Sequence, residues 1–81
     1  MRKITIGRAS ENDIVFEQVD TISSYHSEII IDGSGNITYN AHSTNGSWVN
    51  GQKIHKTSCV VKEGDTIMLP GDVIIEWNQI I

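Results

Sequence analysis

The sequence predicts an all-β fold, a sandwich or barrel built from many short strands. Short runs of apolar residues recur along the 81 residues, and turn-forming pairs such as Asn-Gly and Gly-Asp separate them. No segment repeats apolar residues at the helical period over a useful length. Strands at such close spacing pack into two layers, and their polar loops gather at the ends of the layers.

The first half of the chain contains four candidate strands. They cover residues 3–6, 13–16, 28–32 and 37–40. The first alternates polar and apolar residues, so Ile4 and Ile6 should face inward. The third contains three consecutive isoleucines, a composition typical of a buried strand. Gly33-Ser34-Gly35-Asn36 then supplies a hairpin turn into the fourth.

The second half continues with shorter strands. They are expected at residues 47–49, 52–54, 58–62, 66–69 and 73–77. Asn50-Gly51 joins the first two as a tight hairpin, because both residues accept positive φ. In the last strand we expect Val73, Ile75 and Trp77 to share one buried face.

Composition argues against several classes of protein. The net charge is −4 and no basic cluster occurs, so we expect no nucleic-acid partner. Cys59 is the single cysteine and the three histidines lack metal-ligand spacing, so we expect no disulfide, metal or cofactor. No apolar run approaches the roughly 20 residues of a membrane span, and the start lacks a signal-peptide pattern. We therefore expect no membrane association and a cytoplasmic location.

Small polar residues and glycines form an ordered set of loop motifs. The motifs are Gly7-Arg8, Asn12-Asp13-Ile14, Ser23 with His26, Ser43-Thr44-Asn45-Gly46, Asn50-Gly51 and Gly64-Asp65. In this order and at these separations they resemble the forkhead-associated (FHA) domain, a module that binds phosphothreonine peptides through loops at one end. The resemblance implies an FHA-like (SMAD/FHA) β-sandwich of about ten to eleven short, mainly antiparallel strands. It covers nearly the whole chain, so we expect a single domain over residues 1–81.

The resemblance also implies a site for a phosphate group. A phosphate near pH 7 carries about −1.5 to −2 charges and three acceptor oxygens, so it favours a guanidinium with several neutral donors. Arg8 would supply the positive charge. Ser23 and Thr44 would donate hydroxyl bonds to phosphate oxygens, and Asn45 would bond the peptide main chain beside the phosphothreonine.

Other residues of these motifs would shape the loops. By resemblance, His26 holds the loops from behind and does not touch the ligand. The remaining scaffold positions are Gly7, Gly46, Asn50 and Gly51, which allow bends that a Cβ would obstruct.

One position departs from the family pattern, because Ser24 stands where the family commonly has arginine. Ser24 keeps a hydroxyl donor, so we include it among the binding residues. The missing cation should weaken phosphate binding or change the residue preferred downstream in the peptide. Lys53 is a candidate to compensate for it. Taken singly, Arg8 is better interpreted as an ordinary surface arginine, and only its context favours a binding role. Ser23 and Thr44 are most often turn residues, a role that can coexist with binding.

Three functions are compatible with these observations. The first is a non-catalytic phosphothreonine-peptide recognition module that mediates phosphorylation-dependent interaction in signalling or complex assembly, within a larger protein or complex. The second is a phosphate-independent interaction module of the same fold with a degenerate anion site. A small hydrolase is the third, but the chain has no Gly-x-Ser-x-Gly sequence. The resemblance favours the first.

Overall fold

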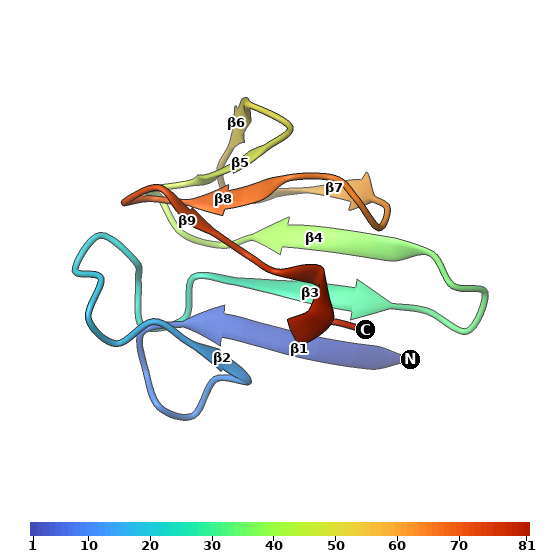
Figure 1. The fold of residues 1–81 in the computed structure, drawn as a ribbon, viewed down its shortest axis with the longest axis horizontal. Helices are drawn as coiled ribbons and strands as arrows, with labels where there is room; N and C mark the ends of the chain where they lie inside the picture. Colours follow the sequence, from blue (N-terminus) through green and yellow to red (C-terminus); the bar gives the residue numbers. More distant parts are fainter.

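The isoleucine run at residues 29–31 lies in the central strand of the larger of two sheets (Figure 1). The computed structural model describes all 81 residues and confirms the all-β class. The larger sheet has the order β2-β1-β3-β4-β7. Its strands are β1 (Arg2–Gly7), β2 (Ile14–Val15), β3 (Ser27–Ile31), β4 (Ile37–Ala41) and β7 (Thr57–Val61). All neighbours are antiparallel except β1 and β2, which run parallel.

The smaller sheet has four antiparallel strands in the order β6-β5-β8-β9. They are β5 (Ser47–Val49), β6 (Gln52–Ile54), β8 (Ile67–Leu69) and β9 (Val73–Ile74). Asn50 and Gly51 form the expected tight turn between β5 and β6, with φ of 52° and 85°. The Asn50 N–H donates to the Thr66 carbonyl at 2.8 Å, and its side-chain oxygen accepts from the Thr66 N–H at 2.9 Å. The turn is thereby fastened to the start of β8.

The last strand is shorter than the sequence suggests, and the structure has nine strands where the resemblance implied ten or eleven. After Ile74 the chain turns into a 3₁₀ helix, η1 (Trp77–Gln79). This turn is stabilised by the Gln79 side chain, which accepts from the Glu76 N–H at 3.4 Å, and by the indole of Trp77, which donates to the Asp65 carbonyl at 2.7 Å. These contacts end the strand while still burying Ile75. This three-residue turn is the chain's one helix, and no helix here is long and apolar enough to cross a membrane.

The core between the sheets consists of thirteen buried apolar residues. They are Ile4, Ile6, Ile14, Ile22, Ile29, Ile37, Tyr39, Ala41, Val61, Ile67, Leu69, Ile75 and Ile80. The inward direction expected for Ile4 and Ile6 is confirmed, since they are 4% and 0% exposed. Burying a side chain of this size contributes about 1.5–3 kcal/mol. The hydroxyl of Tyr39 joins the layers by bonding Ser27 in one sheet and Ser47 in the other, at 2.9 and 2.7 Å.

Strand register brings three loops to one end of the sandwich. Ile6 near the end of β1 pairs with Ser27 at the start of β3, which pairs with Ala41 at the end of β4. The segments 8–13, 16–26 and 42–46 therefore emerge side by side, and we call them the site loops (Figure 1). Both termini lie at the opposite end, beside the turns at 32–36 and 62–66 (Figure 1).

Candidate functional site

Gly7 lets the first two site loops touch through their backbones. A Cβ at this position would lie 2.2 Å from the carbonyl oxygen of Ser24, closer than any side chain tolerates. The contact is reinforced next door, where the N–H groups of Arg8 and Ala9 donate to the carbonyls of Ser23 and Ser24 at 2.9 and 3.2 Å. The end of β1 and the segment before β3 are thus joined through their backbones.

Asn12 adds side-chain contacts to this junction. From the sequence we did not place Asn12 among the site residues. Its side-chain amide donates to the Ala9 carbonyl at 2.9 Å and to the Ser24 carbonyl at 2.7 Å. The second bond crosses between two loops. Its place in the Asn12-Asp13-Ile14 motif was the one available signal.

His26 lies between the second and third site loops and is fully buried. Its Nδ1 accepts from the Ser23 N–H at 3.1 Å, and its Nε2–H donates to the Gly46 carbonyl at 2.7 Å. This pattern requires the neutral ring, because a protonated Nδ1 cannot accept. Burial, which disfavours the charged ring, lowers the pKa of His26, and the bond to Gly46 opposes this only in part. The carbonyl of His26 also accepts from the N–H groups of His42 and Ser43, both at 3.1 Å.

Ser43 is a second residue that, from the sequence, we named within a motif but did not place among the site residues. It is 6% exposed, and its hydroxyl lies 2.7 Å from the hydroxyl of Ser23. The same oxygen accepts from the Asn45 N–H at 3.1 Å, and its carbonyl accepts from the Gly46 N–H. Ser43 therefore shapes the turn that carries Thr44 and Asn45 and links this turn to Ser23.

Thr44 and Asn45 are both exposed on the surface of that turn. The side-chain amide of Asn45 donates to the Thr21 carbonyl at 2.9 Å, so its Nδ2 is oriented by another loop while its oxygen remains available as an acceptor. Gly46 follows with a φ of 78°, and a Cβ there would lie 2.8 Å from the Ile54 carbonyl. The turn needs glycine at this position for both reasons.

Two cations border the site in different ways. The guanidinium of Arg8, with its side chain 40% exposed, lies 4.0 Å from the carboxylate of Asp20, an exposed pair worth little. Lys53 runs past Gly46, its Cε 3.1 Å from where a Gly46 Cβ would be, and its ammonium lies 5.5 Å from the centre of the Trp48 ring. Lys53 thus borders the turn at Asn45 but is directed toward Trp48.

The arrangement brings together every predicted site residue except the Asn50-Gly51 pair, which contacts Thr66 and not the site loops. The grouped side chains offer a guanidinium, hydroxyls and an amide on an open surface. The hollows of the molecule lie elsewhere, one beside Ile31, Ile37 and Val60 and the other beside Val49 and Ile54.

The chemistry of this surface suits binding and not nucleophilic catalysis. His26 Nδ1 contacts the backbone N–H of Ser23 and not its hydroxyl, so the two residues lack the geometry of an activated nucleophile. No group of three or more His, Cys, Asp or Glu side chains is placed to hold a metal ion.

Comparisons with known proteins point to one family. A model of the FHA domain family matches residues 4–70. The serine/threonine-protein kinase RAD53 of Saccharomyces cerevisiae is 38% identical over 64 residues, which are 78% of this chain and 8% of that kinase. The chain therefore spans only a small part of this curated relative.

Solved structures give the same result. The N-terminal FHA domain of S. cerevisiae Rad53p, in complex with a phosphothreonine peptide, matches with a TM-score of 0.79 and 32% identity, over 89% of this chain and 59% of that chain. EmbR of Mycobacterium tuberculosis, in complex with a low-affinity phosphopeptide, matches with a TM-score of 0.77 and 29% identity, over 89% of this chain and 18% of that chain.

Proposed function

Since the chain belongs to the FHA domain family, we propose that it recognises phosphothreonine-containing peptides and so mediates phosphorylation-dependent protein–protein interaction. Two of its structural relatives were solved with such ligands, a phosphothreonine peptide and a phosphopeptide. We propose further that residues 1–81 form one domain without catalytic activity. It would act in signalling or complex assembly as part of a larger cytoplasmic protein or complex.

The observation that supports the proposal is that three loops, each carrying a predicted donor, are joined at one end of the sandwich. Arg8, Ser23 and Thr44 belong to loops that are joined by backbone and side-chain hydrogen bonds. Asn45 is exposed beside Thr44 on the same turn, and we propose that it bonds the peptide main chain there. Hydrogen bonds to charged groups contribute about 1.5–3 kcal/mol each. Three or four of them support micromolar binding, which corresponds to about −8 kcal/mol.

The charge of the whole chain does not prevent this. The net charge is −4, but salt screens charges that lie beyond about 8 Å at physiological ionic strength. A single phosphate therefore responds mainly to Arg8 and the nearby donors. Ser24 adds a hydroxyl and no charge, and Lys53 is directed toward Trp48, so the affinity should lie at the weak end for such a site.

Calorimetric titration tests the proposal directly. Pools of phosphothreonine peptides should bind, and the same pools without phosphate should not. Arg8→Ala should weaken binding by about 10- to 150-fold, the value of one charge-assisted bond. The variant should unfold at the wild-type temperature, because the contact of Arg8 with Asp20 is exposed and long.

Arg2→Ala is the matched control, since Arg2 is exposed at the start of β1, the strand that Arg8 directly follows. It should bind like the wild type. Equal binding of phosphorylated and unphosphorylated pools would refute the proposal. A natural partner that is retained after phosphatase treatment would instead favour a phosphate-independent module of the same fold.

A further inference from the structure

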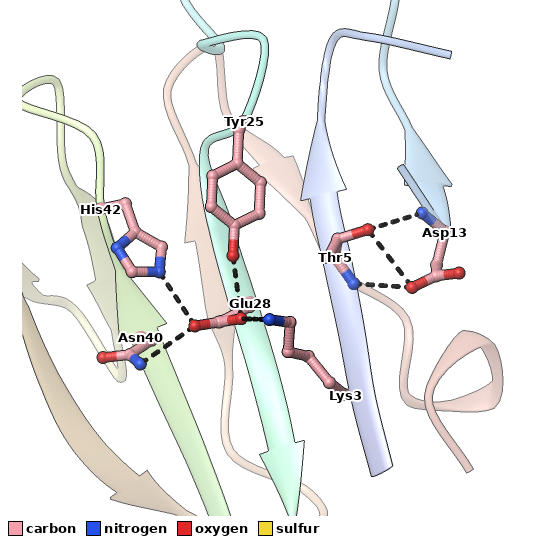
Figure 2. Close-up of polar contacts among 7 residues, drawn as sticks. All are labelled: Lys3, Thr5, Asp13, Tyr25, Glu28, Asn40 and His42. Carbon is pink, nitrogen blue, oxygen red and sulfur yellow. Dashed lines mark hydrogen bonds and ion pairs between the residues drawn. The ribbon is translucent and has the colours of Figure 1, made fainter. Parts of the chain in front are cut away.

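A nearly buried carboxylate lies on the outer face of the larger sheet, behind the site loops. Glu28 of β3 has a side chain only 9% exposed, and Figure 2 shows four side chains converging on it. Its Oε2 accepts from the Tyr25 hydroxyl at 2.8 Å and pairs with the Lys3 ammonium at 3.3 Å. Its Oε1 accepts from His42 Nε2–H at 3.0 Å and from the Asn40 amide at 3.3 Å.

The four partners of Glu28 are of two kinds. Lys3 and Asn40 belong to strands β1 and β4, so their bonds tie the sheet to itself. Tyr25 and His42 belong to two different site loops, next to Ser24 and Ser43 in the sequence. Their rings also stack, with centroids 5.0 Å apart and planes inclined by 25°. The stack and the shared carboxylate join the two loops across the outer face (Figure 2).

His26 joins the same two loops from the inner face. It is buried and bonds Ser23 in one loop and Gly46 in the other. Its neighbour Tyr25 is exposed on the opposite side of the sheet. The segments that carry Ser24 and Thr44 are thus held from both faces.

The charge states of Glu28 and Tyr25 are constant across the physiological range of pH. Burial raises the pKa of Glu28, but hydrogen bonds from His42, Tyr25 and Lys3 outweigh it and lower the pKa to about 2. Burial and the bond to Glu28 raise the pKa of Tyr25 to about 12. Near neutral pH the carboxylate is therefore charged and the tyrosine hydroxyl keeps its proton.

We propose that Tyr25 and His42 are positioning residues for phosphopeptide binding, which set the spacing between the Ser23-Ser24 segment and the Thr44-Asn45 turn through their stack and their shared bond to Glu28. The inference rests on the proposed function of this site. Neither residue needs to touch the ligand. Their effect is to hold the donors at the separation that a phosphate requires, so that binding does not have to order the loops.

The test compares two variants that replace loop partners of Glu28 with one variant that replaces a strand partner. Tyr25→Leu and His42→Leu should each weaken phosphothreonine-peptide binding about five- to tenfold, the range of one or two hydrogen bonds. The double variant should lose little more than the single ones, because the pair acts as a unit. Tyr25→Phe keeps the ring and should recover part of the loss. Lys3→Met should lower the melting temperature but leave the dissociation constant within about twofold.

Amide hydrogen exchange of the ligand-free protein gives a readout that does not depend on the peptide. The N–H groups of Ser23, Ser43 and Asn45 should exchange faster in both leucine variants and at the wild-type rate in Lys3→Met, while the amides of β3 and β4 stay protected. Wild-type exchange and wild-type affinity in both leucine variants would overturn the inference and leave the proposed function standing. A wild-type protein that does not prefer phosphorylated peptide would overturn the function, and the binding role of the pair with it.

Discussion

The two ends of the sandwich are held together in different ways. At the end with the site loops, four side-chain hydrogen bonds join residues 12 to 24 positions apart in the sequence. At the opposite end, each turn is closed by its own aspartate, and the 62–66 turn is also bonded by the distant Asn50 and Trp77. Asp32 accepts from the N–H groups of Ser34 and Asn36, both at 2.9 Å, and Asp65 accepts from the Lys62 N–H at the same distance.

This difference indicates which part of the molecule couples ligand binding to the stability of the fold. A turn closed by its own residues can be altered with only a local effect. Loops that hold one another depend on the strand register that brings them together, so a change in one loop displaces the donors on the others. We therefore expect ligand binding to depend on residues that never touch the ligand, and we expect changes at the far end of the molecule to affect binding little.

The largest contrast is expected between two glycines, one at each end. Gly7→Ala places a methyl group 2.2 Å from the Ser24 carbonyl, so the two loops must separate. We expect a loss of about 3 kcal/mol in the free energy of unfolding and a loss of phosphopeptide binding. Chemical denaturation and calorimetric titration measure the two effects.

Gly33→Ala is the control for this substitution, since a Cβ at Gly33 meets no atom within 4 Å and its φ is not positive. It should leave binding unchanged and raise stability slightly, by about 0.4–1 kcal/mol. If both alanine variants behaved alike, the close approach at Gly7 would have no importance for the site.

A smaller effect is expected from the protonation of His26. Burial lowers the pKa of His26 in the folded protein, while in the unfolded chain it stays near 6.5. Between these two pKa values the unfolded state therefore binds more protons than the folded state. The stability is fully present above about pH 6.5 and decreases as the pH falls toward the pKa of His26 in the folded protein. Denaturation curves between about pH 7 and pH 5 should show this decline.

Substitution identifies the group responsible for that decline. His26→Asn should be less stable at neutral pH and should show a flatter profile, because the titrating group is gone. His55→Asn changes an exposed histidine outside the site loops and should retain the wild-type slope. A slope that persists in His26→Asn would assign the pH dependence to another group.

The smallest effect is expected at the far end. Asp32→Ala removes the acceptor for two backbone N–H groups within one exposed turn. The melting temperature should fall by no more than about 5 °C, and phosphopeptide affinity should not change. Glu63→Ala, at an exposed position of the other turn, is the control for loss of a negative charge. Weaker peptide binding by Asp32→Ala would show that the two ends are coupled after all.

The difference between local and long-range contacts also explains how much of the structure the sequence predicted. Strands, the inward direction of Ile4 and Ile6, and the Asn50-Gly51 turn were accessible because alternation and turn chemistry are local. The grouping of Arg8, Ser23, Thr44 and Asn45 at one end came from the family resemblance. The binding roles of these residues remain predictions.

The residues that the sequence did not reveal act across long separations. Asn12 bonds Ser24, Ser43 bonds Ser23, and Glu28 has partners on two strands and two loops. Each of these contacts depends on which strands are neighbours and in what register, which no short stretch of sequence encodes. The early end of β9 has the same origin, because Trp77 leaves the strand to bond the distant Asp65 carbonyl.

The way Ser24 is held has a consequence for how such a site can diversify. The carbonyl oxygen of Ser24 accepts hydrogen bonds from Ala9 and Asn12 and lies close to the backbone of Gly7. The side chain of Ser24 is exposed and does not contribute to these contacts. The path of the loop is thus independent of the residue that occupies position 24. A charged or bulky residue can therefore replace serine at position 24, in evolution or by design, while the backbone of the loop keeps its conformation. Such a substitution would alter which peptides are preferred.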